Sequence, residues 1–291
     1  MKKLIYFHGF GSSAASGTIK MLREKLNDFE VIAPDIPVDP TEALPFLKEL
    51  CQREQPDVIA GTSMGGMYAQ QMSGFYRICV NPAFYMSKTS KVLKVGTFEF
   101  FKPRLDGIKE FTITDDIIRH FAEMESKQFD GVTSEDCEKV WGMFGDNDSQ
   151  VNCEDVFSRY YHHVVHFHGE HRLDEKAIDE ILIVLIRQLA LKQNNWDKVM
   201  KIANELETKI ESAKATKDIY FPWKDVLHSM REYPEKVRVS ETVCPICGKK
   251  CLEIYFSSPD WTWHNLCGRA GTMNICTDCI KQVDFHLELM N

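Results

Sequence analysis

The sequence lacks a long apolar run. The apolar stretch at residues 181–186 is ended by Arg187, far short of the roughly 18 apolar residues that a bilayer span requires. The apolar stretch that follows Met1-Lys2-Lys3 stops at His8, which is too short for the core of a secretion signal. These absences exclude a membrane-spanning protein and predict a cytoplasmic location.

The sequence also lacks an excess of basic residues. Lys and Arg number 35 against 43 Asp and Glu, so the formal net charge is −8, which gives no electrostatic reason to bind nucleic acid. Apolar residues make up 44% and charged residues 27%, which excludes collagen-like and disordered chains. We find no internal repeat, and at about 150 residues per domain a chain of this length predicts two domains.

Cysteine is scarce in most of the chain and crowded at its end. Of the 10 cysteines, Cys51, Cys79, Cys137 and Cys153 stand singly, whereas the other six lie between Cys244 and Cys279. In a reducing compartment, paired Cys-x-x-Cys units are better interpreted as metal ligands than as a disulfide framework. The crowding therefore predicts a separate metal-binding module.

Short β-type apolar runs alternate with helical stretches over the first two thirds of the chain. This alternation predicts parallel strands joined by helical crossovers, and hence a doubly wound, mostly parallel α/β sheet. The expected strands are residues 4–7, 29–33, 57–60, 77–80, 140–144 and 163–167.

The pattern divides the chain into three parts. We expect an α/β domain over residues 1–191, a helical connector over 192–238 and a cysteine-rich module over 239–291. An insertion of about residues 86–138 interrupts the α/β domain. It contains the aromatic cluster Phe98 to Phe101 and a helix that begins after Thr114, a good N-cap residue.

The strongest chemical signal is the segment Gly61-Thr62-Ser63-Met64-Gly65. It follows a predicted strand and precedes an amphipathic helix, which is the context that a G-x-S-x-G nucleophile turn requires. The glycines are needed because side chains at their positions would collide with neighbouring backbone. We predict that Ser63 is a catalytic nucleophile.

A serine hydroxyl needs a base to accept its proton, and in this fold the base follows the last strand. His171 is placed there, just before the last helix of the sheet. Of the neighbouring histidines, His166 and His168 would share one face or the edge of the strand, where a structural role is the commoner interpretation. Those neighbours are His162, His163, His166 and His168.

An acid is expected between the serine and the histidine in the chain. The segment 145–151 supplies two candidates, Asp148, which fits a G-x-x-D-x-x-V spacing, and Asp146. We favour Asp148 and keep Asp146 as the alternative. Hydrolysis also needs donors for a developing oxyanion, for which we predict the backbone amides of Phe10 and Met64.

Taken together, residues 1 to about 190 resemble an α/β-hydrolase, specifically the YqiA-like family of short esterases. The resemblance is carried by residues 4–10, 33–37, 61–66 and 80–83. It implies hydrolysis of an ester or thioester of a small acyl substrate by Ser63, His171 and an aspartate. The tail after residue 190 departs from that family's pattern.

The tail contains Cys244-x-x-Cys247 and Cys276-x-x-Cys279, separated by 28 residues. Two such pairs can complete a tetrahedral four-thiolate site, so we predict one structural zinc in a zinc-ribbon-like module. Additional ligand candidates are Cys251, His264 and Cys267.

Two functional hypotheses follow. The first is a serine esterase that needs no catalytic cofactor. The second is a hydrolase-fold scaffold without activity, in which the zinc module binds a protein partner, since fold alone does not determine function.

Overall fold

The computed structural model describes residues 1–88, 93–214, 223–243, 248–256 and 272–275. The contacts within it divide the chain into two compact units, Met1–Ala190 and Leu191–Asn291. In the described residues, no helix is long and apolar enough to cross a membrane.

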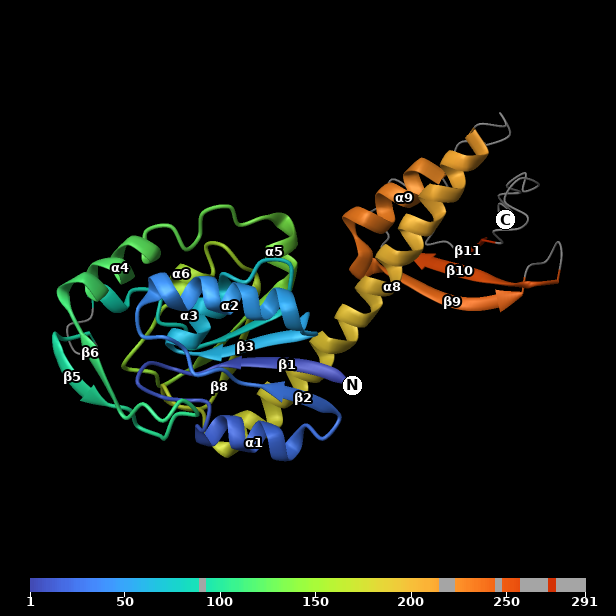
Figure 1. The fold of residues 1–291 in the computed structure, drawn as a ribbon. Coiled ribbons are helices and arrows are strands. Elements are labelled where there is room, and N and C mark those ends of the chain that lie inside the picture. Colours follow the sequence, from blue (N-terminus) through green and yellow to red (C-terminus); the bar gives the residue numbers. More distant parts are fainter. Residues whose placement is uncertain (89–92, 215–222, 244–247, 257–271, 276–291) are drawn as a thin grey trace. The chain divides into compact units, whose positions relative to one another are not determined.

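The first unit is built on a six-stranded parallel sheet with strand order β2-β1-β3-β4-β7-β8 (Figure 1). Strands covered on both faces have apolar side chains in near-continuous runs, which is why all six could be predicted from the sequence. Their bounds are β1 Lys2–Phe7, β2 Phe29–Ile32, β3 Val58–Thr62, β4 Arg77–Val80, β7 Val140–Gly145 and β8 His163–Phe167.

Helices cover both faces of this sheet (Figure 1). One apolar cluster packs Leu47 and Met67 under one layer of helices, and a second packs Leu22 and Ile186 on the opposite face. The predicted doubly wound α/β fold is therefore confirmed. The covering helices are α1 Gly17–Lys25, α2 Pro40–Glu54, α3 Met64–Gln70, α6 Glu154–Phe157, α7 Glu175–Ala177, η2 Ile178–Leu182 and α8 Ile183–Lys214.

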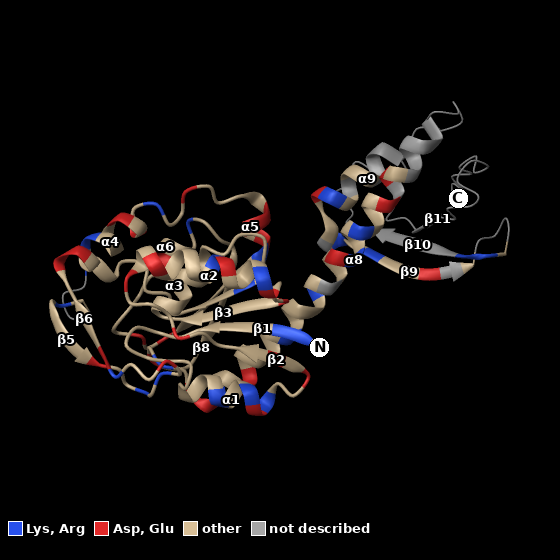
Figure 2. Cartoon of the chain, in the orientation of Figure 1, with Lys and Arg blue, Asp and Glu red and all other residues tan. Residues whose placement is uncertain are grey.

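The order of the strands places the loops after β1 and β3 side by side. Strand β1 pairs with β2 on one side and with β3 on the other, and Phe7 lies opposite Gly61. The chain thus winds in opposite directions from β1, and in open α/β sheets ligands commonly bind beyond the carboxyl ends of the strands at such a point. Strand β3 carries no charged residue, whereas α1 and α2 carry both signs (Figure 2).

The insertion between β4 and β7 holds a helix and a hairpin. The predicted helix is α4, capped by the Thr114 side chain, which accepts a hydrogen bond from the Ile117 amide. The antiparallel hairpin β5–β6 was not predicted. The elements are η1 Met86–Lys88, β5 Gly96–Glu99, β6 Glu110–Ile113, α4 Asp115–Glu125 and α5 Ser134–Lys139.

The loop between β5 and β6 is fastened to the loop that follows β1. The Phe101 amide donates to the Gly11 carbonyl at 2.8 Å, and Ser13 Oγ donates to the Pro103 carbonyl at 2.9 Å. Arg104 also donates to the Ile36 carbonyl at 3.1 Å. The insertion is therefore held against the carboxyl end of the sheet.

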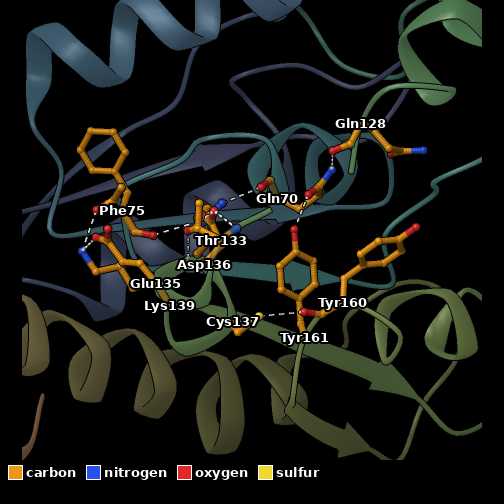
Figure 3. A network of polar contacts seen from close by, with 12 residues as sticks. Gln70, Phe75, Gln128, Thr133, Glu135, Asp136, Cys137, Lys139, Tyr160 and Tyr161 are labelled. Carbon is orange, nitrogen blue, oxygen red and sulfur yellow. Dashed lines mark hydrogen bonds and ion pairs between the residues drawn. The ribbon is translucent and has the colours of Figure 1, made fainter. Parts of the chain in front are cut away.

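The opposite, amino-terminal edge of the sheet contains a buried polar network (Figure 3). Arg77, only 1% exposed, forms an ion pair with Asp136 and donates to the Gln70 carbonyl at 2.6 Å. Burial alone would raise the pKa of Asp136, but the charge of Arg77 and hydrogen bonds from Arg77 and Thr133 outweigh it, so the pKa is lowered. Breaking such a buried pair is strongly destabilising, which gives this network a structural role.

The second unit contains the rest of α8, followed by α9 Trp223–Glu232 and η3 Pro234–Lys236. A three-stranded antiparallel sheet follows, with order β11-β10-β9. Lys198 Nζ donates to the Val239 carbonyl at 2.8 Å, which joins α8 to β9. The strands are β9 Val237–Val243, β10 Lys250–Phe256 and β11 Thr272–Ile275.

Candidate active site

Ser63 occupies a strained turn between β3 and α3. Its φ of 57° and ψ of −118° are rare for a residue with a side chain and cost about 1–3 kcal/mol. A Cβ on Gly61 would lie 2.2 Å from the Gly65 carbonyl oxygen, and one on Gly65 would lie 2.1 Å from the Phe7 carbonyl oxygen. Only glycine fits at either position, so the turn depends on both residues.

Neighbouring backbone holds this turn in place. The Ser63 amide donates to the Val80 carbonyl at 2.9 Å, and the Ser63 carbonyl accepts from the Ala83 and Met67 amides at 3.1 and 3.0 Å. Strained conformations persist where the surrounding structure fixes them in this way. The serine side chain is thereby held at the carboxyl end of β3.

His171 connects Ser63 to Asp148. Its Nε2 lies 3.0 Å from Ser63 Oγ, and its Nδ1 lies 2.7 Å from Asp148 Oδ2. Because an ionised carboxylate only accepts hydrogen bonds, Nδ1 carries the proton and Nε2 presents its lone pair to the serine hydroxyl. The side chains of His171 and Asp148 are 12% and 3% exposed, so little water competes for these hydrogen bonds.

The two candidate acids have different partners. Asp148 Oδ1 accepts from the Gln150 and Val151 amides at 2.8 and 3.0 Å, while its other oxygen faces His171. Asp146 instead accepts from His168 Nδ1 at 2.9 Å and from the Gly169 amide at 3.0 Å. The hydrogen bond from His168, followed by that from Gly169, lowers the pKa of Asp146. Of the two, Asp148 is the one that contacts His171.

Other histidines of the last strand and the loop after it make contacts of their own. His166 Nε2 lies 2.9 Å from the Glu154 carboxylate, and the His163 ring stacks on Trp141 with centroids 4.4 Å apart. His168 is 90% exposed. The contacts of His166 with Glu154 and of His168 with Asp146 are consistent with the structural roles predicted for these two histidines.

The segments that carry the Phe10 and Met64 amides both adjoin Ser63. A Cβ on Gly9 would lie 3.5 Å from Ser63 Cβ, so the loop after β1 packs against the serine turn. Met64 begins α3, and amides in the first turn of a helix have no acceptor within the helix. The loop that carries Phe10 therefore packs against the serine turn, and Met64 follows Ser63 directly in the chain.

His8 shapes the loop that holds Phe10. It is 3% exposed, its Nε2 accepts from the Ile36 amide at 3.1 Å, and its Nδ1 donates to the Gly9 carbonyl at 2.9 Å. Burial is the main cause that lowers the pKa of His8 to about 4. The ring is therefore neutral at pH 7 and holds the loop.

This lowered pKa predicts acid sensitivity. Between pH 6.5 and about 4 the unfolded chain binds a proton at His8 and the folded chain does not, so the free energy of unfolding falls as the pH is lowered. The total decrease in the free energy of unfolding from this cause is about 3 kcal/mol, at 1.36 kcal/mol per pKa unit. Urea unfolding of His8→Asn is expected to show a smaller loss of stability from pH 6.5 to 4.5 than the wild type. His162→Asn, a change at an exposed histidine, is expected to keep the wild-type slope. An unchanged slope in His8→Asn would contradict the prediction.

Aromatic side chains of the insertion gather beside the loop after β1. The Phe111 ring contacts Phe10 edge-on at a centroid distance of 5.4 Å, and it contacts Phe100 at 4.6 Å and Phe98 at 5.8 Å. Phe101, from the same predicted cluster, is 69% exposed and packs against Gly11. Of the aromatic cluster noted in the sequence, Phe98 and Phe100 therefore join the ring contacts around Phe111, whereas Phe101 does not.

Sequence reasoning missed one polar residue at this edge of the sheet. Asn81 follows β4 and is 1% exposed. Its side chain donates to the carbonyls of Glu170 and His171 and accepts from the Gly145 amide. Residues 80–83 were among the segments that carry the family resemblance, but the sequence alone did not predict a role for Asn81.

The predicted zinc ligands Cys244, Cys247, Cys276 and Cys279 lie outside the described residues, as do His264 and Cys267. Within the described ranges, no group of three or more His, Cys, Asp or Glu side chains is arranged to hold a metal ion. Cys51, Cys79, Cys137 and Cys153 are free thiols.

Several solved structures are similar to this chain. Est1E from Butyrivibrio proteoclasticus is 18% identical, with 66% of this chain and 88% of that chain covered and a TM-score of 0.47. The esterase domain of a Rhodothermus marinus protein is 16% identical, with 64% and 87% covered and a TM-score of 0.47. The thioesterase domain from the curacin biosynthetic pathway is 14% identical, with 65% and 90% covered and a TM-score of 0.39.

A family model matches residues 3–176, which is more than half of the chain. The matched stretch lies within residues 1–190, for which a family resemblance was predicted from the sequence. The chain belongs to the uncharacterised protein family UPF0227.

Proposed function

We propose that this protein is a serine hydrolase that cleaves carboxylic ester or thioester bonds of small acyl substrates. The observation that carries the proposal is the continuous hydrogen-bonded path from Ser63 Oγ through His171 to Asp148. A serine, an imidazole and a buried carboxylate in this order form the arrangement that activates a hydroxyl for attack on an acyl carbon.

The reaction proceeds in two stages. Ser63 Oγ attacks the carbonyl carbon while its proton passes to His171 Nε2, and Asp148 stabilises the resulting imidazolium. The Phe10 and Met64 amides stabilise the negative charge on the carbonyl oxygen. The alcohol or thiol leaves with the proton from His171, and an acyl group remains on Ser63. Water then gives a proton to His171 and its oxygen to the acyl carbon, which releases the acid and restores the hydroxyl.

The strained backbone of Ser63 favours catalysis over an inactive scaffold. A scaffold gains nothing from a serine held at a φ of 57°, whereas strain of this kind is typical of functional sites. The aromatic rings around Phe111 suit an apolar acyl group. We assign no charged side chain to substrate binding.

A fluorophosphonate probe tests the proposal without knowledge of the substrate. We expect one covalent adduct per chain, mapped by mass spectrometry to Ser63, and hydrolysis of p-nitrophenyl esters and acyl thioesters of graded chain length. Ser149→Ala, which removes an exposed hydroxyl next to Asp148, is the matched serine control and should label normally. A folded wild-type protein that neither labels at Ser63 nor hydrolyses any member of the panel would favour the scaffold hypothesis.

For the second unit, we propose one structural zinc held by Cys244, Cys247, Cys276 and Cys279. The backbone register supports this assignment, because Val243 pairs with Lys250 and Ile275 pairs with Leu252. The strand ends that precede the two Cys-x-x-Cys units therefore meet near the start of β10. Four thiolates bound to zinc also suit a reducing, cytoplasmic environment.

Metal analysis tests the zinc proposal. We expect about one zinc per chain, lost in Cys244→Ser with Cys276→Ser, together with loss of cooperative unfolding of the second unit, since binding energy of structural zinc is folding energy. The double variant Cys51→Ser with Cys137→Ser, in the first unit, is the matched control and should retain the metal. A wild-type protein purified without chelators that contains no zinc, or a cysteine-depleted tail that retains it, would refute the site.

A further inference from the structure

Asn81 lies at the junction of the three segments that carry the candidate active site. It follows the last residue of β4, Val80, whose carbonyl accepts the Ser63 amide. The Asn81 amide donates to the Met143 carbonyl of β7 at 2.9 Å. Its backbone has a φ of 40°, in a region where asparagine, aspartate and glycine are tolerated better than other residues.

The side chain joins the acid loop to the histidine loop. Asn81 Oδ1 accepts from the Gly145 amide at 2.9 Å, three residues before Asp148. Asn81 Nδ2 donates to the carbonyls of Glu170 and His171 at 3.2 and 3.1 Å. One buried carboxamide therefore contacts the backbone of His171 itself and the start of the segment that carries Asp148.

The chemistry of these contacts requires an amide. Asparagine offers two donors and an acceptor on one planar group, and all three are used here. Aspartate has the same shape but would place a carboxylate against two carbonyl oxygens. Glycine permits the same φ but leaves the Gly145 amide and both carbonyls without this partner, at a buried position where unmade hydrogen bonds are costly.

We infer that Asn81 is a positioning residue: it sets the separation of the Asp148 loop from the His171 loop and thereby aligns His171 between Asp148 and Ser63. The inference rests on the proposed hydrolase function and extends it to a residue that does not touch the reacting atoms. It also assigns a role to the segment 80–83, which contains none of the three proposed catalytic residues.

The test compares Asn81→Asp and Asn81→Gly with the wild type on the best ester of the panel. Turnover is expressed per active site titrated with the fluorophosphonate, which corrects for any unfolded fraction. We expect kcat to fall about 10- to 100-fold in both variants, because displacement of a catalytic group by about 1 Å has effects of this size, with KM changed less than about threefold. The pH at which kcat/KM is half-maximal should also shift, since the contact between His171 and Asp148 is altered.

A matched control is Asn152→Asp, the same change at an exposed asparagine four residues after Asp148, which should keep kcat within about twofold of the wild type. Asn81→Ser, which retains a single donor, is used if either larger change prevents folding. The inference would be overturned if a folded Asn81 variant had wild-type turnover per titrated site and an unchanged pH profile. It would also be overturned if all three variants failed to fold, because Asn81 would then act on stability alone. Absence of Ser63-dependent activity in the wild type would instead reject the proposed function.

Discussion

Replacement of Ser63 with alanine is expected to lower kcat on the best ester by roughly 10⁴- to 10⁶-fold, with little change in KM. The hydroxyl is the atom to which the acyl group is transferred, and it is the group that His171 Nε2 contacts at 3.0 Å. Residual hydrolysis then depends on water and on the oxyanion donors alone. Initial rates on the wild type and Ser63→Ala, prepared side by side, give the ratio.

Alanine at position 63 adds no backbone strain, because Ser63 already carries a Cβ at a φ of 57°. The variant should therefore remain folded, with a thermal unfolding midpoint close to that of the wild type. Ser149→Ala is expected to keep full turnover, which separates loss of the nucleophile from general effects of serine removal. Turnover by Ser63→Ala above one tenth of the wild-type value would exclude Ser63 as the nucleophile.

The central sheet was predictable because buried parallel strands have a simple signature. Val58 and Ile78 lie in short apolar runs bounded by helical stretches, and both are fully buried in the sheet. Parallel strands place their carboxyl ends at one edge, so the positions of Ser63 and His171 after their strands were enough to predict that they share that edge. The hydrogen bond between them depends in addition on the paths of the loops that follow β3 and β8.

The hairpin β5–β6 could not be predicted in the same way. Phe98 and Phe111 face each other across it, but Phe98 stands in the run Phe98 to Phe101, which lacks clear alternation and has the pattern of an aromatic cluster. Pairing between segments separated by a loop depends on register, and a single sequence does not reveal which residues meet.

Long-range polar contacts escaped prediction for a related reason. Arg77 and Asp136 are 59 residues apart, and Asn81 lies 89 and 90 residues from the carbonyls that it contacts. The sequence alone does not show which distant residue a charged or amide side chain near a strand will contact, because that depends on how the strands are ordered in the sheet. The spacing of the acid loop favoured Asp148 over Asp146 but left both open, because only the path of the loop decides which carboxylate faces His171.

Replacement of that carboxylate supplies the second large effect. Asp148→Asn is expected to lower kcat about 10⁴-fold, because an amide in place of the carboxylate favours the wrong tautomer of the histidine and no longer stabilises its protonated form. The shape of the side chain is retained, and the carbonyl oxygen of the new carboxamide can still accept from the Gln150 and Val151 amides that bind the native residue. The loss is therefore one of proton transfer and should appear in kcat more than in KM.

Asp146→Asn provides the matched control two residues away. Asp146 is 48% exposed and its ion pair with His168 faces solvent, so its charge contributes little, and an amide oxygen still accepts from the Gly169 amide. We expect kcat within about threefold of the wild type, against about 10⁴-fold for Asp148→Asn. The opposite ranking, with activity retained in Asp148→Asn and lost in Asp146→Asn, would transfer the acid role to Asp146. The comparison decides between the two carboxylates because the substitutions are chemically identical and differ only in which loop position loses its charge.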